Sequence, residues 1–153
     1  MLGASPAETL THRLILPREA NHHGTLYAGA MLTLALEAGY ATAYRSIGGP
    51  ANLVLKRVLD LRCLEPVPIG RVVEVRGLEV YRARAQVVVG LIGTPLVGRS
   101  KPWMDGLMQF VQVDASGSPD PIPVLPGVEG PAAWPGPWAV LRDRAVKLLA
   151  IRG

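Results

Sequence analysis

The longest apolar stretch of the chain runs from Ala28 to Tyr44, and Glu37 is its only charged residue. A helix that is apolar on nearly every face must be covered on most of its sides. Gly48, Gly49 and Pro50 follow it, and such residues are typical of the end of a helix. The stretch therefore predicts a buried central helix, capped at its start by Thr25 or a neighbour.

Polar and apolar residues alternate after this helix, which is typical of a β-strand with one buried face. The apolar positions of the first such strand are Leu53, Leu55, Leu59, Leu61 and Cys63, with Lys56, Asp60 and Arg62 on the other face. Further β-rich stretches lie at 13–16, 72–81, 85–92 and 101–114, separated by turns rich in Gly, Pro, Asp and Ser. The order predicts an α+β fold, with an antiparallel sheet wrapped around the single helix.

The chain divides by composition near residue 123. Residues 1–123 hold the predicted sheet and helix, whereas the tail over 124–153 begins with a stretch rich in Pro and Gly. The segment WAVLRDRAVKLLAI, Trp138 to Ile151, has helical periodicity and predicts a terminal amphipathic helix. We expect one domain over residues 1–123, followed by this tail.

Composition narrows the classes of function. The 153 residues carry a net charge of +4, but the basic residues are scattered and aromatic residues make up only 5%. Nucleic-acid binders usually cluster their charge and interleave aromatics, so a small phosphorylated ligand is favoured over nucleic acid. Residues 1–11 show no signal-peptide pattern, and no apolar run is long enough to cross a membrane. The single cysteine, Cys63, fits a reducing cytoplasm and is predicted to be a buried structural thiol.

Glu37 is the first candidate for chemistry. Burying an unpaired carboxylate costs several kcal/mol or raises its pKa until it becomes neutral. Glu37 therefore either reaches water or an arginine at an edge of the helix, or faces a pocket as a general base or nucleophile. The sequence alone leaves both interpretations open.

The loop before the helix offers a second candidate. Asn21 and Gly24 lie just ahead of the helix N-terminus, where free backbone N–H groups around Ala28 to Ala30 can polarise a carbonyl oxygen. His12, His22 and His23 lack the spacing of a metal site, so no metal is expected. The chain also contains neither the G-x-S-x-G elbow of serine hydrolases nor a phosphate-binding P-loop.

Four cations near the predicted hairpin ends are candidates for a cationic mouth: Arg82, Arg84, Arg99 and Lys101. Arginine suits bidentate contact with phosphate. Ordinary solvated turn charge explains the same residues equally well.

The segment LPREANHHGTLYAGAML…LEAGYATA resembles the opening of the acyl-CoA thioesterase branch of the hotdog superfamily. The matching residues there are Pro17, Asn21, Gly24, Tyr27, Ala28 and Gly29. CLEPVPIGRVVEV is similar to the family's strand–turn pattern at Cys63, Pro66, Val67, Gly70 and Val73. LMQFVQVDASGSPDPIP resembles its last strand and turn at Phe110, Val111, Asp114, Gly117, Pro119 and Pro123. The likeness covers about Leu14 to Pro123.

This resemblance implies a hotdog fold and hydrolysis of an acyl-CoA thioester, with coenzyme A entering as part of the substrate and no other cofactor. It implies a homodimer, or a tetramer or hexamer built from dimers, with sites between subunits. The implied catalytic residues are Glu37 as base or nucleophile, Asn21 to orient water or carbonyl, and the amides near Gly29 for the oxyanion.

The sequence departs from the family pattern at three places, one of which is the tail beyond Pro123, which has no counterpart in that pattern. The family's usual helix carboxylate, an Asp, aligns with Leu36, one residue before Glu37, although some similar members carry a Glu in the later register. The turn that lines the CoA site in the family is replaced here by Arg82-Ala83-Arg84-Ala85-Gln86. A non-catalytic acyl-CoA-binding module therefore stays open as an alternative, and a hotdog dehydratase ranks last because no histidine is suitably placed.

Overall fold

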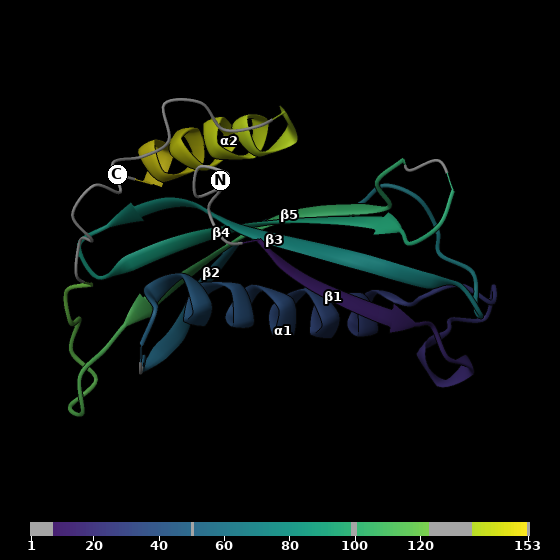
Figure 1. Cartoon of the computed structure of the whole chain (residues 1–153), viewed down its shortest axis with the longest axis horizontal. Coiled ribbons are helices and arrows are strands. Elements are labelled where there is room, and N and C mark those ends of the chain that lie inside the picture. The colour runs from purple at the N-terminus through teal and green to yellow at the C-terminus, as the bar shows by residue number, and fades with distance from the viewer. Residues whose placement is uncertain (1–7, 50, 99–100, 123–135, 153) are drawn as a thin grey trace, which may run out of the picture.

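The computed structural model describes residues 8–49, 51–98, 101–122 and 136–152, in three layers (Figure 1). A curved sheet forms the middle layer, with helix α1 against its inner face and helix α2 across its outer face. The elements in chain order are β1 (Thr9–Leu14), the 3-10 helix η1 (Pro17–Glu19), α1 (Ala28–Ile47), β2 (Leu53–Cys63), β3 (Val72–Ala83), β4 (Gln86–Pro95), β5 (Met104–Gln112) and α2 (Gly136–Arg152). The predicted α+β class, with an antiparallel sheet around one helix, is confirmed.

The five strands pair in the order β1-β3-β4-β5-β2, and every pairing is antiparallel. β1 begins at Thr9 rather than at the predicted Arg13, and its six residues alternate between half-buried and exposed. The predicted strand over 13–16 was therefore wrong in extent, because the half-buried side of this edge strand carries Thr9, Thr11 and Arg13 and gives no apolar alternation to read. β2 forms the opposite edge and pairs only with β5 among the described strands.

α1 packs on the inner face and is three residues longer than predicted. It ends at Ile47, and Gly48 adopts a left-handed conformation with φ of 80°. The predicted side-chain cap is absent, because the residue preceding the helix is Tyr27, which makes no capping hydrogen bond. Gly77 of β3 lets the helix approach closely, since a Cβ there would collide with Oγ1 of Thr42.

The outer face of the sheet carries α2, which confirms the predicted C-terminal helix. Trp138, Leu141 and Ala145 are buried against the sheet. They lie over Gly90 of β4, where an added Cβ would come within 3.2 Å of Leu141. Most of the predicted irregular segment, over 124–137, lies outside the described residues.

β2 departs from the simple alternation that its sequence predicts. Its pairing with β5 shifts register between Leu55 and Arg57 and again between Val58 and Asp60. Each shift inserts an extra residue and turns the following side chains toward the other face. The two shifts cancel, so Cys63, which pairs with Met104, returns to the inner face, but it lies at the exposed end of an edge strand. The prediction of a buried structural thiol was therefore wrong.

Within the described residues, no helix has the length and apolar character needed to cross a membrane. The same residues contain no cluster of His, Cys, Asp or Glu that could hold a metal ion.

A charged network fastens α2 to the sheet and makes the stability of the protein depend on pH. Arg144 of α2 contacts Asp60 at 3.1 Å and Asp105 at 3.3 Å, and Arg62 binds Asp105 through two hydrogen bonds. Burial works to raise the pKa of Asp105, but the hydrogen bond from Arg62 and the charges of Arg144 and Arg62 hold that pKa below its ordinary value.

Because the folded-state pKa of Asp105 is lowered, its stabilising contribution is complete above the unfolded pKa of about 3.9 and is lost as the pH falls below it. We therefore expect the thermal unfolding midpoint to drop on acidification below about pH 4. Asp105→Asn should lower the midpoint at pH 7 and flatten its dependence on pH in this range. An unchanged pH profile in the Asn variant, measured by circular dichroism, would assign the acid sensitivity to other groups.

Candidate functional site

The loop between η1 and α1 is shaped by Asn21. Its Oδ1 accepts hydrogen bonds from the amides of His23 at 2.9 Å and Thr25 at 3.1 Å, and its Nδ2 donates to Oγ1 of Thr25. The amide of Leu26 binds the carbonyl of Val67, which docks the loop on the turn between β2 and β3. Asn21 thus holds the loop in place, as asparagine often does in turns.

The start of α1 presents backbone donors beside this loop. Tyr27 precedes the helix without a side-chain cap, and no acceptor in the described part of the chain binds the amides of Ala28, Gly29 or Ala30. A Cβ at Gly29 would lie 2.6 Å from Cε2 of the Tyr27 ring, so a larger residue at this position would force that ring to move. The helix N-terminus therefore combines free N–H groups with partial positive charge, which suits an oxyanion or a polarised carbonyl.

Glu37 lies on the side of α1 that faces away from the sheet, and 66% of its side chain is exposed in the single chain. The description of α1 as covered on nearly every side was therefore wrong for one chain alone. Nη1 of Arg13 lies 3.8 Å from Oε1 of Glu37. Of the two interpretations of Glu37, the isolated chain shows the one in which the carboxylate reaches water and an arginine.

Arg13 connects Glu37 to a second carboxylate, Glu19, which sequence reasoning did not single out. Glu19 is buried, pairs with Arg13 and accepts the amide of Leu16 at 3.0 Å. This amide hydrogen bond, with help from Arg13, holds the pKa of Glu19 below its ordinary value although burial acts in the opposite direction. Glu19 stays ionised and fixes Arg13, so Arg13 is held beside Glu37. The only signal in the sequence was the position of Glu19 directly after Pro17-Arg18.

The loop–helix junction and Glu37 are too far apart in one chain to act on the same carbonyl. Eight residues separate Gly29 from Glu37 along α1, which corresponds to about 12 Å of helix axis. A Glu side chain does not span that distance. A working pair of oxyanion site and carboxylate requires the two from different copies of the chain.

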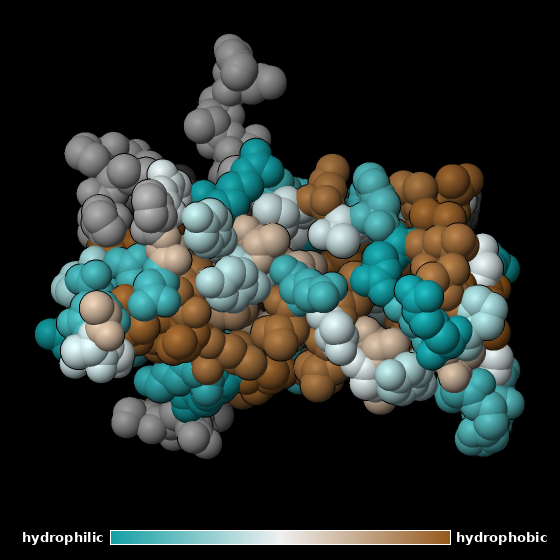
Figure 2. Space-filling model, turned by 90° about the horizontal axis from the view of Figure 1, so that it is seen from below, coloured by the Kyte–Doolittle hydropathy of each residue, from teal (hydrophilic) through white to brown (hydrophobic). Residues whose placement is uncertain are grey.

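Exposed apolar side chains lie on both α1 and β2. Leu32, Tyr40 and Tyr44 of α1 each expose 40% or more of their surface. Val54, Leu55 and Val58 of the unpaired edge strand β2 are exposed to the same degree. Figure 2, seen from the α1 side, shows apolar residues gathered in a band across this face. Exposed apolar patches of this kind mark sites of association.

The four predicted cations do not form one mouth in a single chain. Arg82 donates to Glu79 and to the carbonyl of Ser46, whereas Arg84 occupies the turn between β3 and β4. Lys101 is exposed beyond the opposite end of β4, where Gly93 pairs with Met104, and Arg99 lies outside the described residues. The ten residues of β4 separate the two ends by about 30 Å.

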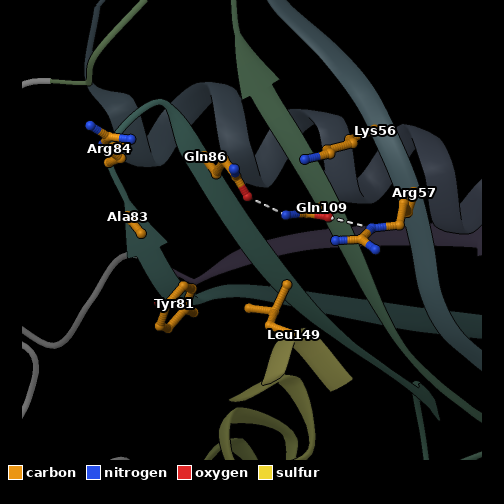
Figure 3. Close-up of a pocket in the computed structure, with 8 residues that line it drawn as sticks. All are labelled: Lys56, Arg57, Tyr81, Ala83, Arg84, Gln86, Gln109 and Leu149. Atoms are coloured by element: carbon orange, nitrogen blue, oxygen red, sulfur yellow. Dashed lines mark hydrogen bonds between the residues drawn. The ribbon is translucent and has the colours of Figure 1, made fainter. Parts of the chain in front are cut away.

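A depression of about 620 Å³ lies on the outer face of the sheet (Figure 3). Its lining residues are Lys56, Arg57, Tyr81, Ala83, Arg84, Gln86, Gln109 and Leu149. Of these residues, the sequence had indicated only Arg84 as a candidate for binding phosphate. Lys56 and Arg57 come from β2, and the sequence offered no signal for them beyond their charge.

No protein-family model and no curated protein matches the sequence. Among solved structures, the acyl-CoA hydrolase from Staphylococcus aureus in complex with butyryl coenzyme A, coenzyme A and coenzyme A disulfide matches with a TM-score of 0.80 at 18% identity, over 95% of this chain and 85% of that one. The chain has the hotdog fold. An apo-hexameric acyl-CoA thioesterase matches with a TM-score of 0.76 at 24% identity, over 95% and 90% of the two chains. The acyl-CoA hydrolase from Bacillus cereus gives a TM-score of 0.71 at 18% identity, over 95% and 83%.

Likeness at these identities establishes the fold, and it agrees with the fold that the sequence resemblance implied. Several of the similar structures are hexameric thioesterases. The structure adds to this likeness the loop–helix junction at Asn21 and Gly29 and a carboxylate on the exposed side of α1.

Proposed function

We propose that the protein hydrolyses acyl-CoA thioesters to a free acid and CoA. The observation that carries the proposal is the junction of the Asn21 loop with α1, whose first amides are free, on a fold whose similar structures are acyl-CoA hydrolases and thioesterases. Free amides at a helix start suit the oxyanion that forms when a thioester carbonyl is attacked.

The site is completed by a second copy of the chain. The loop and the helix start come from one subunit, and Glu37 of the partner subunit faces them across the apolar surface of α1 and β2. The separation of about 12 Å between the two halves in one chain supports this arrangement. Homodimers, or tetramers and hexamers built from dimers, satisfy it equally.

In this reaction Glu37 takes a proton from a water molecule as the water oxygen attacks the thioester carbon, or its carboxylate attacks that carbon directly. The amides of Ala28 and Gly29 hold the oxyanion of the tetrahedral intermediate, and the second N–H of the Asn21 amide orients the water or the carbonyl. The C–S bond then breaks. The CoA thiolate leaves without strong acid assistance, because a thiol has a pKa of about 8.5. If Glu37 was the nucleophile, a water molecule next hydrolyses the resulting acyl–Glu37 anhydride, which releases the free acid and restores the carboxylate. Coenzyme A enters as part of the substrate, and no further cofactor takes part.

The main alternative to hydrolysis follows from the position of the carboxylate of Glu37 on α1. Structures of the S. aureus hydrolase include variants with an Asn and an Asp replaced by Ala, and that Asp follows that Asn by fifteen positions. The same spacing from Asn21 leads to Leu36, one residue before Glu37. A protein that binds acyl-CoA without hydrolysing it is therefore the second candidate, because Leu36 has no acid or base to offer.

Cationic side chains supply contacts for the phosphates of CoA in this proposal. Arg84 is better placed for this role than Arg82, because Arg82 is held by Glu79. Lys101 and Arg99 serve the same role only if the assembly brings the far end of β4 near a bound substrate. The exposed thiol of Cys63 suits a cytoplasmic location, where thiols stay reduced.

A thiol-release assay over acyl-CoA esters of increasing chain length tests the proposal directly. Release of free CoA at a rate proportional to protein concentration is the expected result. Binding of the esters without any release establishes the binding module instead, and the absence of both removes acyl-CoA from consideration.

A further inference from the structure

The depression on the outer face of the sheet is strongly cationic. Three of its lining residues, Lys56, Arg57 and Arg84, are positively charged, and none of the eight is acidic. Within the described residues, the side chains of Lys56 and Arg84 make neither an ion pair nor a hydrogen bond, and the one side-chain partner of Arg57 is the neutral Gln109. Arg62 and Arg144, on the same face outside the pocket, are neutralised by Asp105.

Buried amides hold the floor of this pocket in place. Gln109 is 1% exposed. Its Oε1 accepts a hydrogen bond from Nε of Arg57 at 2.8 Å, and its Nε2 donates a hydrogen bond to Oε1 of Gln86. Figure 3 shows Gln86, Gln109 and Arg57 as a connected row across β4, β5 and β2, with Lys56 beside it. The row fixes Arg57 by its Nε and leaves its two terminal nitrogens for a ligand. Gln86 keeps its NH2 group as a further donor.

Arg84 occupies a position that the backbone disfavours for it. Its φ is 53°, which makes it the one described residue other than glycine with a positive φ. Glycine adopts this conformation without strain, whereas a residue with a Cβ does not. Local strain of this kind often accompanies a functional side chain, and here it sets a guanidinium at the rim of the pocket.

We propose that this pocket binds the di- or polyphosphate group of a small molecule. Lys56 provides a point charge, Arg57 and Arg84 provide planar forks that match phosphate oxygens, and Gln86 donates a hydrogen bond. Tyr81 and Leu149 form an apolar wall that suits the rest of the molecule. The volume of about 620 Å³ is typical of small-molecule sites.

The pocket is separate from the proposed catalytic residues of the same chain. Val87 and Phe110 point into the core beneath α1, so their neighbours Gln86 and Gln109 point to the opposite face of the sheet. The phosphates therefore come either from a substrate CoA held by a neighbouring copy or from a separate nucleotide. The first source rests on the proposed function, and the second does not.

Binding of pyrophosphate to the full-length protein in its native assembly tests the proposal without any catalytic readout. Calorimetry should show saturable binding that weakens with added salt. The variant with Lys56→Ala and Arg84→Gly should bind about tenfold more weakly or worse, since it loses two charge-assisted contacts. Arg84→Gly relieves the strained φ, so the fold should be retained.

Lys147→Ala is the matched control, because Lys147 is an exposed cation of α2 that does not line the pocket. Its affinity for pyrophosphate should stay within about twofold of the unchanged protein. Absence of pyrophosphate binding at millimolar concentration overturns the proposal. Equal binding by the double variant, or an equal loss in Lys147→Ala, overturns it as well.

The source of the phosphates is decided with free CoA, ATP and acyl-CoA turnover. A matching loss of CoA affinity and rise in KM in the double variant identifies the phosphates of CoA. Loss of ATP binding with an unchanged KM identifies a separate nucleotide. If the protein hydrolyses no acyl-CoA, the pyrophosphate experiment still decides whether the pocket binds phosphate groups.

Discussion

Glu37→Gln should lower kcat for the best acyl-CoA substrate by on the order of 10² or more, the usual effect of removing a general base. Glutamine keeps the size and much of the hydrogen bonding of the side chain but cannot accept the proton of the attacking water. The stability of the fold should be retained or slightly raised, because Glu37 lies on the surface of the single chain and makes only a 3.8 Å contact with Arg13. Steady-state thiol release measures kcat and KM separately.

Two further variants make this experiment decisive. Glu65→Gln removes an exposed carboxylate in the turn after β2 and should leave turnover unchanged. The double change Leu36→Asp with Glu37→Ala moves the carboxylate by one residue, a rotation of about 100° around the helix. Activity in the double variant with none in Glu37→Gln would show that either register reaches the carbonyl. Wild-type turnover in Glu37→Gln would remove Glu37 from the chemistry.

Patterns that act over short distances in the sequence predicted the fold well. The apolar stretch at 28–44 became α1, and Gly48 ended that helix through a positive φ as such residues do. The last helix was predicted from its periodicity, and it buries Trp138 and Leu141 as an amphipathic helix should. Each of these signals lies within the element that it predicts.

The exposure of β2 could not be predicted in the same way. The two register shifts of β2 depend on how it pairs with β5, about fifty residues later in the chain. No residue within β2 indicates where these shifts occur. Cys63 was assigned to the wrong environment because only the strand order places the end of β2 at an open edge of the sheet. The coverage of α1 was overestimated for a related reason, since an apolar helix face is equally consistent with its own sheet and with a second copy of the chain.

The candidate sites were predicted only where one short segment carries them. Asn21, Gly29 and Glu37 lie within a single stretch of sequence, but about 12 Å of helix axis separates Gly29 from Glu37 in one chain, so their joint action stays a prediction. The outer pocket joins Lys56 of β2, Gln109 of β5 and Arg84 of the β3–β4 turn, and only the strand order brings them together. The same strand order separates Lys101 from Arg84, although the two had been predicted to act together.

The protein should be an oligomer at micromolar concentration, with a mass by light scattering of at least twice the 16.3 kDa of one chain. The eleven residues of β2 leave one side of their backbone unpaired in the described chain, next to exposed Val54 and Val58 and the apolar side of α1. An open edge with apolar neighbours favours association with a second copy. Assembly also supplies the second half of the proposed site, because Gly29 and Glu37 are separated along α1.

Replacing Val54 and Val58 by lysine should therefore abolish both assembly and activity. Lysine on an edge strand opposes pairing through its charge and its solvation. We expect a mass near 16.3 kDa, retained secondary structure by circular dichroism, and thiol release reduced to background. Val140→Lys is the matched control, because Val140 is 59% exposed on α2, on the opposite face of the sheet, and should change neither property. A monomeric unchanged protein that still hydrolyses acyl-CoA would show that one chain contains the whole site, and the two-subunit arrangement would then be wrong.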